Sequence, residues 1–81
     1  MGEKVSKFTD LVEAELLKAR AKFPTGMHGP HESYAVILEE LDEFWDEVRS
    51  QNHYPGKMLK ELVQVAAMCA RAAEDCGFVE E

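Results

Sequence analysis

The hydrophobic positions of this chain repeat at the spacing of an α-helix in three separate segments. The first covers residues 3–22, and Pro24 ends it because a proline disfavours the helical conformation in the residue before it. The second covers residues 31–51 and the third residues 57–76, where Gly77 is suited to end the helix. None of the segments shows the strict alternation that is typical of a β-strand. We therefore predict an all-α fold of three helices.

The second and third helices are apolar over more of their surface than a three-helix monomer can cover. Between Leu62 and Ala73, only Gln64 and Arg71 are polar. In the second helix, a line of large residues runs beside the line of Ile37 and widens the stripe that must be covered: Tyr34, Leu38, Leu41, Trp45 and Val48. We interpret Leu41, Phe44 and Trp45 as core residues. For Tyr34 and Trp45, packing at a subunit interface and stacking on a nucleobase are alternatives.

Chain length leads to the same expectation. The 81 residues suit a single domain, residues 1–81, and a chain of this size buries only about 60% of its unfolded surface. Small helical chains often gain stability by associating. We therefore predict a short helical bundle that is completed by homo-oligomerisation, as a homodimer or a homotetramer.

Composition and charge exclude several classes of partner. The formal charge of −7 disfavours nucleic acid, because phosphate binding needs clustered Lys and Arg. No apolar run approaches the roughly 20 residues that cross a bilayer, and the N-terminus lacks the apolar segment of a signal peptide. We therefore expect a cytoplasmic protein with no membrane partner, in which Cys69 and Cys76 are reduced and packed as small apolar residues. An acidic chain can still bind nucleotides where metal ions bridge carboxylates and phosphates.

The second predicted helix carries an unusually acidic block, in which six of the nine residues 39–47 are Asp or Glu. Glu40, Glu43 and Glu47 fall on one narrow strip of the helix, along the border of its apolar stripe. Like charges at this spacing destabilise a helix by a few tenths of a kcal/mol per pair, and a divalent cation would offset that repulsion. An acidic run is more commonly a solvated face, which is our interpretation of Asp42 and Asp46.

The third predicted helix carries a second acidic position near its start, where Glu61 is followed three residues later by Gln64. A charge on an otherwise apolar helix is costly unless it is paired or bound to a metal. Helical bundles build metal sites from carboxylates that project from facing helices, and ligand sets made of oxygen alone favour Mg²⁺ or Mn²⁺ over zinc. We therefore predict that Glu40, Glu43, Glu61 and Gln64 ligate Mg²⁺, with Mn²⁺ as an alternative.

The two blocks together resemble a known signature. Glu39-Glu40-x-x-Glu43, followed after seventeen residues by Glu61-x-x-Gln64, is similar to the motif of the MazG-type all-α nucleotide pyrophosphohydrolases. The resemblance covers about residues 28–76. It implies an oligomeric helical bundle that binds a nucleotide through Mg²⁺ and hydrolyses an NTP or dNTP to the monophosphate and pyrophosphate.

Matching this motif residue by residue implies roles for individual side chains. Glu40, Glu43 and Glu61 would be the catalytic metal ligands, Gln64 would occupy the fourth place, and Glu39 would be an auxiliary acid. We assign Glu47 to the same auxiliary group. Basic residues available to phosphate oxygens are present on the third helix, although nothing in the sequence selects one of them: Lys57, Lys60 and Arg71.

Position 64 departs from the family pattern, which has Asp where this chain has Gln. A carboxamide offers a neutral oxygen that cannot take up a proton, so the site should hold Mg²⁺ more weakly. Three outcomes stay open: a working variant, an enzyme with a shifted substrate or metal preference, or a catalytically degenerate module that binds nucleotide or a protein partner. A purely structural dimerisation bundle with its acids in solvent is a further alternative.

Overall fold

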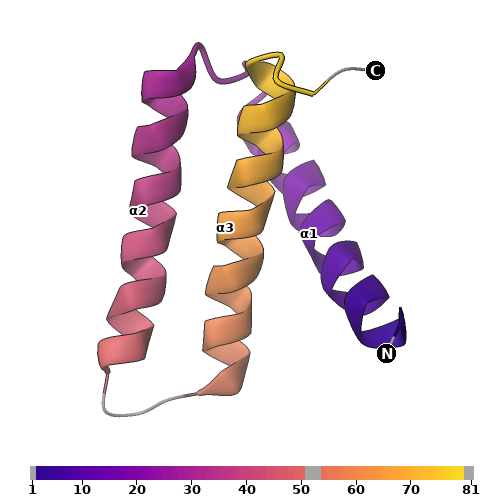
Figure 1. Ribbon diagram of the computed structural model, residues 1–81, viewed down its shortest axis with the longest axis vertical. Coiled ribbons are helices and arrows are strands. Elements are labelled where there is room, and N and C mark those ends of the chain that lie inside the picture. Colours follow the sequence, from indigo (N-terminus) through magenta and orange to yellow (C-terminus); the bar gives the residue numbers. More distant parts are fainter. Residues whose placement is uncertain (1, 51–53, 80–81) are drawn as a thin grey trace.

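A computed structural model of the chain describes residues 2–50 and 54–79, with side chains from residue 7 onward. It contains three α-helices, α1 (Gly2–Lys22), α2 (Pro30–Arg49) and α3 (Pro55–Asp75), and no strand within these ranges (Figure 1). The predicted all-α fold of three helices is confirmed. The second helix ends at Arg49, earlier than predicted, and Gln51 lies outside the described residues.

The helices α2 and α3 lie side by side and antiparallel, and α1 crosses behind α3 in the view of Figure 1. α3 is therefore the helix that contacts both of the others. Within the single chain, α2 is covered along one edge, where it packs against α3. None of the described helices is both long enough and apolar enough to span a lipid bilayer.

Local sequence signals set the ends of the helices. Pro30 occupies the first turn of α2, where a missing N–H costs nothing, and α1 ends two residues before Pro24. At the end of α3, Gly77 adopts a φ of 74°, a left-handed conformation that glycine tolerates. Its N–H donates to the Glu74 carbonyl at 3.2 Å, and the Phe78 N–H donates to the Ala73 carbonyl at 2.8 Å. These two bonds form a Schellman cap, which confirms Gly77 as the residue that ends the helix.

The hydrophobic core is built mainly from small side chains and methionines. Its buried members come from α1, the loop after it and α3, and they are Ala19, Met27, Ala67, Met68 and Ala72. Partly buried residues of α1 and α2 pack against them: Val12, Leu16, Val36 and Ile37. No large side chain in the described part of the chain is fully buried. The core of a single chain is therefore thin, as expected for so short a sequence.

Several residues that we predicted to be buried are exposed in the single chain. Leu41 is 48% and Trp45 is 57% exposed, so the assignment of these two residues to the core is wrong for one chain, whereas Phe44 is partly buried. Cys69, which we expected to be packed, is exposed as well. The reason is the position of α1, which covers the rear of α3 and leaves the front of the α2–α3 pair open (Figure 1).

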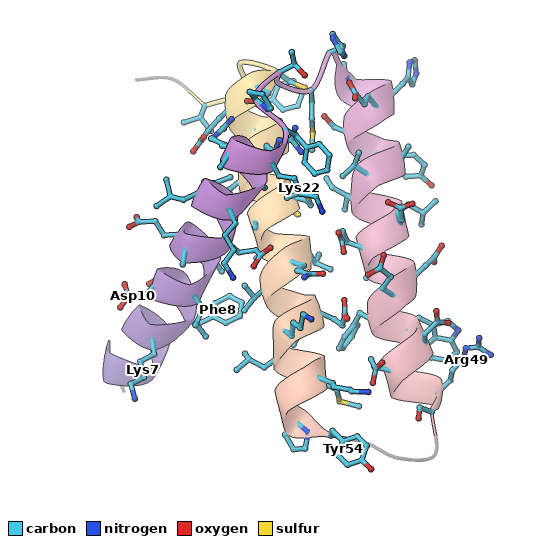
Figure 2. The ribbon with its side chains drawn as sticks, turned by 180° about the vertical axis from the view of Figure 1, so that it is seen from behind. Lys7, Phe8, Asp10, Lys22, Arg49 and Tyr54 are labelled. Carbon is cyan, nitrogen blue, oxygen red and sulfur yellow. The ribbon has the colours of Figure 1, made fainter. Side chains whose placement is uncertain are left out.

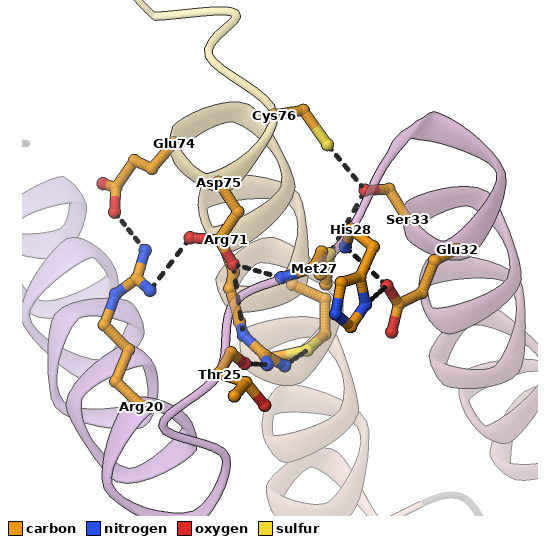
Figure 3. A network of polar contacts seen from close by, with 11 residues as sticks. Arg20, Thr25, Met27, His28, Glu32, Ser33, Arg71, Glu74, Asp75 and Cys76 are labelled. Carbon is orange, nitrogen blue, oxygen red and sulfur yellow. Dashed lines mark hydrogen bonds and ion pairs between the residues drawn. The ribbon is translucent and has the colours of Figure 1, made fainter.

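A polar network centred on Asp75 fastens the end of α1 and the following loop to the end of α3 (Figure 3). The Met27 N–H donates to one Asp75 oxygen at 2.9 Å, and the Arg20 Nη1 donates to the other at 3.0 Å. The hydrogen bond from Met27 and the neighbouring Arg20 hold the pKa of Asp75 below its ordinary value. Arg71 lies beneath them, 7% exposed, and donates to the Thr25 carbonyl at 3.2 Å.

Candidate functional site

The two acidic blocks meet between α2 and α3. Glu40 and Glu43 lie three residues apart on one face of α2, and Glu61 projects from the antiparallel α3 beside them. One carboxylate oxygen from each of these three residues lies within 4.8 Å of the other two. The structure thus brings together the three glutamates that the sequence singled out as a set.

Two of these carboxylates are partly withdrawn from water. Glu40 Oε2 and Glu61 Oε1 are shielded from solvent, and neither has a hydrogen-bond partner among the described residues. Burial raises the pKa of Glu40, and the charges of Glu43 and Glu61 raise it further. Burial also raises the pKa of Glu61, again with a contribution from Glu43. A shielded carboxylate without a partner is unfavourable when ionised, and either a proton or a cation relieves the cost.

The three side chains would have to draw closer together to share one small hard cation. With Mg²⁺–oxygen bonds of about 2.0–2.1 Å, neighbouring oxygens of an octahedron lie about 2.9 Å apart and opposite ones about 4 Å apart. Because Glu43 is exposed, its side chain can move closer to the other two without disturbing the core. Exposed acidic groups are common without an ion, and the two shielded oxygens are what distinguish this cluster from them.

Gln64 and Glu39 line grooves that adjoin Glu40. Gln64 and Glu40 share a groove of about 300 Å³ that lies over α3, between α1 and α2. Glu39 and Glu40 line a second groove of about 370 Å³. The two grooves share Lys22, Phe23, Glu40 and Met68, so Glu40 stands at their junction. Each groove falls within the size range of small-molecule sites, roughly 300–1,000 Å³.

The acids that we predicted to be auxiliary extend the cluster along α2. The charge of Glu39 contributes to the raised pKa of Glu40, and the charge of Glu47 contributes to the raised pKa of Glu61. Both residues therefore lie close enough to interact with the central three. Of the central and auxiliary acids, Glu39 and Glu40 line the second groove and make its α2 side negative.

The three basic residues singled out from the sequence occupy different surroundings. Lys57 lies over the ring of Tyr54, with its Nζ 5.8 Å from the ring centroid. Lys60 lines a separate, largely apolar groove together with Leu11 and Leu59. Arg71 lines the groove that contains Glu39 and Glu40, but its guanidinium is buried and bonded to the loop.

Sequence reasoning missed a basic residue from α1. Lys22, at the end of that helix, lines both grooves and faces the acidic side of α2 (Figure 2). Lys18, four residues earlier, lines the first groove. The spacing of these lysines places them on one face of the helix, but the sequence does not reveal which helix that face meets.

No family model, curated protein or solved structure matches this chain. The likeness to the MazG-type enzymes therefore rests on the two acidic motifs. The case for a function depends on the residues that line the site and on their chemistry.

Proposed function

We propose that this chain is a Mg²⁺-dependent nucleotide pyrophosphohydrolase that converts an NTP or dNTP to the monophosphate and pyrophosphate. One observation carries the proposal. Glu40, Glu43 and Glu61, from two helices, offer oxygens within 4.8 Å of one another, and two of these residues hold shielded, unpartnered oxygens. The MazG-like spacing of the same residues supports it, and the adjoining grooves supply space for a nucleotide.

The donor set fits Mg²⁺, because its oxygens are hard ligands. Glu40, Glu43 and Glu61 would hold the ion, and Gln64 would add a neutral amide oxygen from the same groove as Glu40. A bound Mg²⁺ polarises phosphate oxygens and lowers the pKa of a coordinated water.

The basic residues of the grooves complete the site. Lys22 lies across the grooves from the acids and would neutralise phosphate charge on that side. Lys22 is exposed and a lysine stem is flexible, so its ammonium could follow the triphosphate as the leaving pyrophosphate gains charge. Arg71 would act mainly by holding the loop whose first residue, Phe23, lines the second groove.

A second candidate is a catalytically degenerate MazG-like module that binds nucleotide or a protein partner. The observation that favours it is Gln64, which gives the site one negative charge fewer than the family pattern and no group that exchanges a proton there. Such a module would keep the grooves and a weak affinity for cations while lacking turnover.

We also propose that the functional form is a homo-oligomer, a dimer or a tetramer, in which a second copy completes the helical bundle. The thin core of the single chain and the exposure of Leu41 and Trp45 support this proposal. Folding of so short a chain benefits from the additional burial.

A nucleotide panel tests the enzymatic proposal. Purified protein is incubated with the common NTPs and dNTPs and Mg²⁺ or Mn²⁺, and released pyrophosphate is measured. We expect release from at least one nucleotide, a loss of at least 100-fold in Glu61→Gln, and little change in Glu13→Gln, an exposed residue on α1. Absence of release from every nucleotide at high protein concentration would contradict the proposal.

Gln64→Asp separates the two candidates. If the protein is an enzyme adapted to a neutral fourth ligand, the substitution reduces an existing activity. If it is a degenerate module, the added carboxylate strengthens Mg²⁺ binding in calorimetry while turnover stays absent. The matched variant Gln64→Ala removes the ligand altogether and should weaken Mg²⁺ binding in either case.

A further inference from the structure

An exposed apolar seam runs along α2. Tyr34, Leu38, Leu41 and Trp45 follow one another at intervals of four, three and four residues and are 68%, 39%, 48% and 57% exposed. This spacing is the one by which a helix presents a continuous line to a neighbouring helix in a coiled coil. Single exposed apolar residues are ordinary, but a continuous line of large ones marks a contact surface.

A second seam follows the neighbouring helix α3. It consists of Leu59, Leu62, Ala66, Cys69 and Ala73, again at intervals of three and four, with Leu59 42% and Leu62 41% exposed. It contains no charged residue. The two alanines leave room for another helix to approach closely.

Both seams lie on the same side of the molecule, opposite the acidic grooves. The grooves are lined from α2 by Glu32, Val36, Glu39 and Glu40, and from α3 by Gln64, Met68 and Arg71. At about 100° per residue, the centre of each seam lies roughly 180° around its helix from the centre of these lining residues. α1 crosses on the groove side, behind α3 in the view of Figure 1. At the edge of the α3 seam, Leu59 shares a groove with Leu11 of α1.

We propose that a second copy of this chain packs on the surface formed by the two seams, which we call the α2–α3 face. Two antiparallel helices from each copy would then form a four-helix bundle about a two-fold axis, an arrangement in which the same patch meets itself. The acidic residues that line the grooves stay on the outside of this dimer.

The apolar area of the face matches what a stable dimer needs. At about 150–250 Å² for a whole aromatic side chain, the exposed parts of Tyr34 and Trp45 offer roughly 250 Å². The exposed parts of the four leucines add on the order of 150 Å². A standard interface buries about 800 Å² per partner, of which about 56–65% is apolar. The seams therefore supply most of the apolar share of such an interface.

Charge favours a second copy over a basic partner. Because Glu39, Glu40, Glu43 and Glu47 lie away from the seam of α2, two copies can meet on this face without bringing those glutamates together. A basic partner would be attracted to the groove side instead, where the acids gather. The face itself offers mainly apolar contacts, as the interfaces of stable homodimers do.

The test combines the mass of the protein in solution with the reactivity of Cys69. Sedimentation equilibrium of the wild type should give twice the 9.2 kDa chain mass, or a multiple of that dimer. Leu41→Glu should shift the mass to that of one chain, whereas Leu17→Glu, on α1 and 65% exposed, should not. Circular dichroism establishes that each variant is helical.

The reactivity of Cys69 reports on the face, because Cys69 belongs to the α3 seam. It is exposed in the single chain, so the proposal expects it to react at least ten-fold more slowly with N-ethylmaleimide in the wild type than in Leu41→Glu. Mass spectrometry resolves it from Cys76, whose Sγ lies 3.2 Å from the Ser33 hydroxyl and serves as an internal reference. A wild-type monomer at 50 µM in which Cys69 reacts like a free thiol would overturn the proposal. A dimer that persists in Leu41→Glu, with Cys69 still reactive, would overturn it as well.

Discussion

Replacing Glu40 with Gln should stabilise the protein when no metal is present. Two unit charges 4.8 Å apart, the upper limit for the oxygens of this cluster, repel by about 0.9 kcal/mol in water and about 3.5 kcal/mol at an effective dielectric constant of 20. Glu40 has two neighbours within this limit, Glu43 and Glu61. Because Glu43 is exposed and salt screens the cluster, we expect a net gain of about 1–2 kcal/mol. For a domain of this size, that gain raises the melting temperature by roughly 4–16 °C.

Divalent metal should remove most of the difference in stability between the wild type and Glu40→Gln. If the wild-type site binds Mg²⁺ with a dissociation constant of about 1 mM, 10 mM Mg²⁺ stabilises it by about 1.4 kcal/mol. Glu40→Gln should lose most of that increment, because one charged ligand is gone. Glu13→Gln, an exposed glutamate on α1, removes the same charge far from the cluster and should behave like the wild type.

Calorimetric melting of the three proteins with EDTA, Mg²⁺ or Mn²⁺ measures both effects. The pKa values of Glu40 and Glu61 are raised by folding, so their stabilising contribution is present below the ordinary carboxyl pKa and is lost as the pH rises through the raised values. The metal-free wild type should therefore lose more stability over that window than Glu40→Gln. The reasoning is refuted if Mg²⁺ and Mn²⁺ stabilise both proteins equally, or if Glu40→Gln lowers the metal-free melting temperature.

Two further predictions concern the network at the end of α3. Asp75→Asn should cost about 2–3 kcal/mol in urea unfolding at pH 7, because it weakens charge-assisted hydrogen bonds from Met27 and Arg20. Since folding lowers the pKa of Asp75, the difference from the wild type should shrink as the pH falls below the ordinary Asp value and through the lowered one; a difference that persists unchanged in acid would contradict this. Gly26→Ala should cost about 1–3 kcal/mol, because its Cβ would lie 3.0 Å from the Asp75 Cγ. Gly56→Ala, whose Cβ would meet nothing within 4 Å, should gain up to about 1 kcal/mol, and equal effects of the two substitutions would exclude the steric explanation.

The parts of the fold that local chemistry controls could be predicted from the sequence. Helical periodicity located all three helices, and Pro24 and Gly77 marked two of their ends because their backbone preferences act within a few residues. The meeting of Glu43 with Glu61 also followed from sequence. Helices joined by a short connection pack antiparallel, and the acids lie at matching distances from that connection.

The parts that depend on the placement of α1 could not be predicted. Whether α1 crosses the groove side or the seam side of the α2–α3 pair is a matter of three-dimensional packing, and that choice decides the neighbours of Lys22. The anchoring of Met27 by Asp75 depends on the same choice, because it joins residues 48 positions apart. The hydrophobic pattern likewise placed Trp45 on an apolar stripe that should be buried. It did not show whether the same chain or another one packs against Trp45, which is exposed in the single chain.

The acidic cluster and the seams are connected through the stability of the fold. Mutually repelling, partly shielded glutamates cost free energy, and the core that must offset this cost contains no fully buried large side chain among the described residues. A second copy on the α2–α3 face adds apolar burial on one side, and a cation removes repulsion on the other. The second copy and the cation would each bind only the folded chain. Their stabilising effects should therefore add as long as the two sites are independent. The metal-induced gain in melting temperature should therefore be similar in the wild type and in a folded Leu41→Glu monomer, provided that each subunit carries its own complete acidic site.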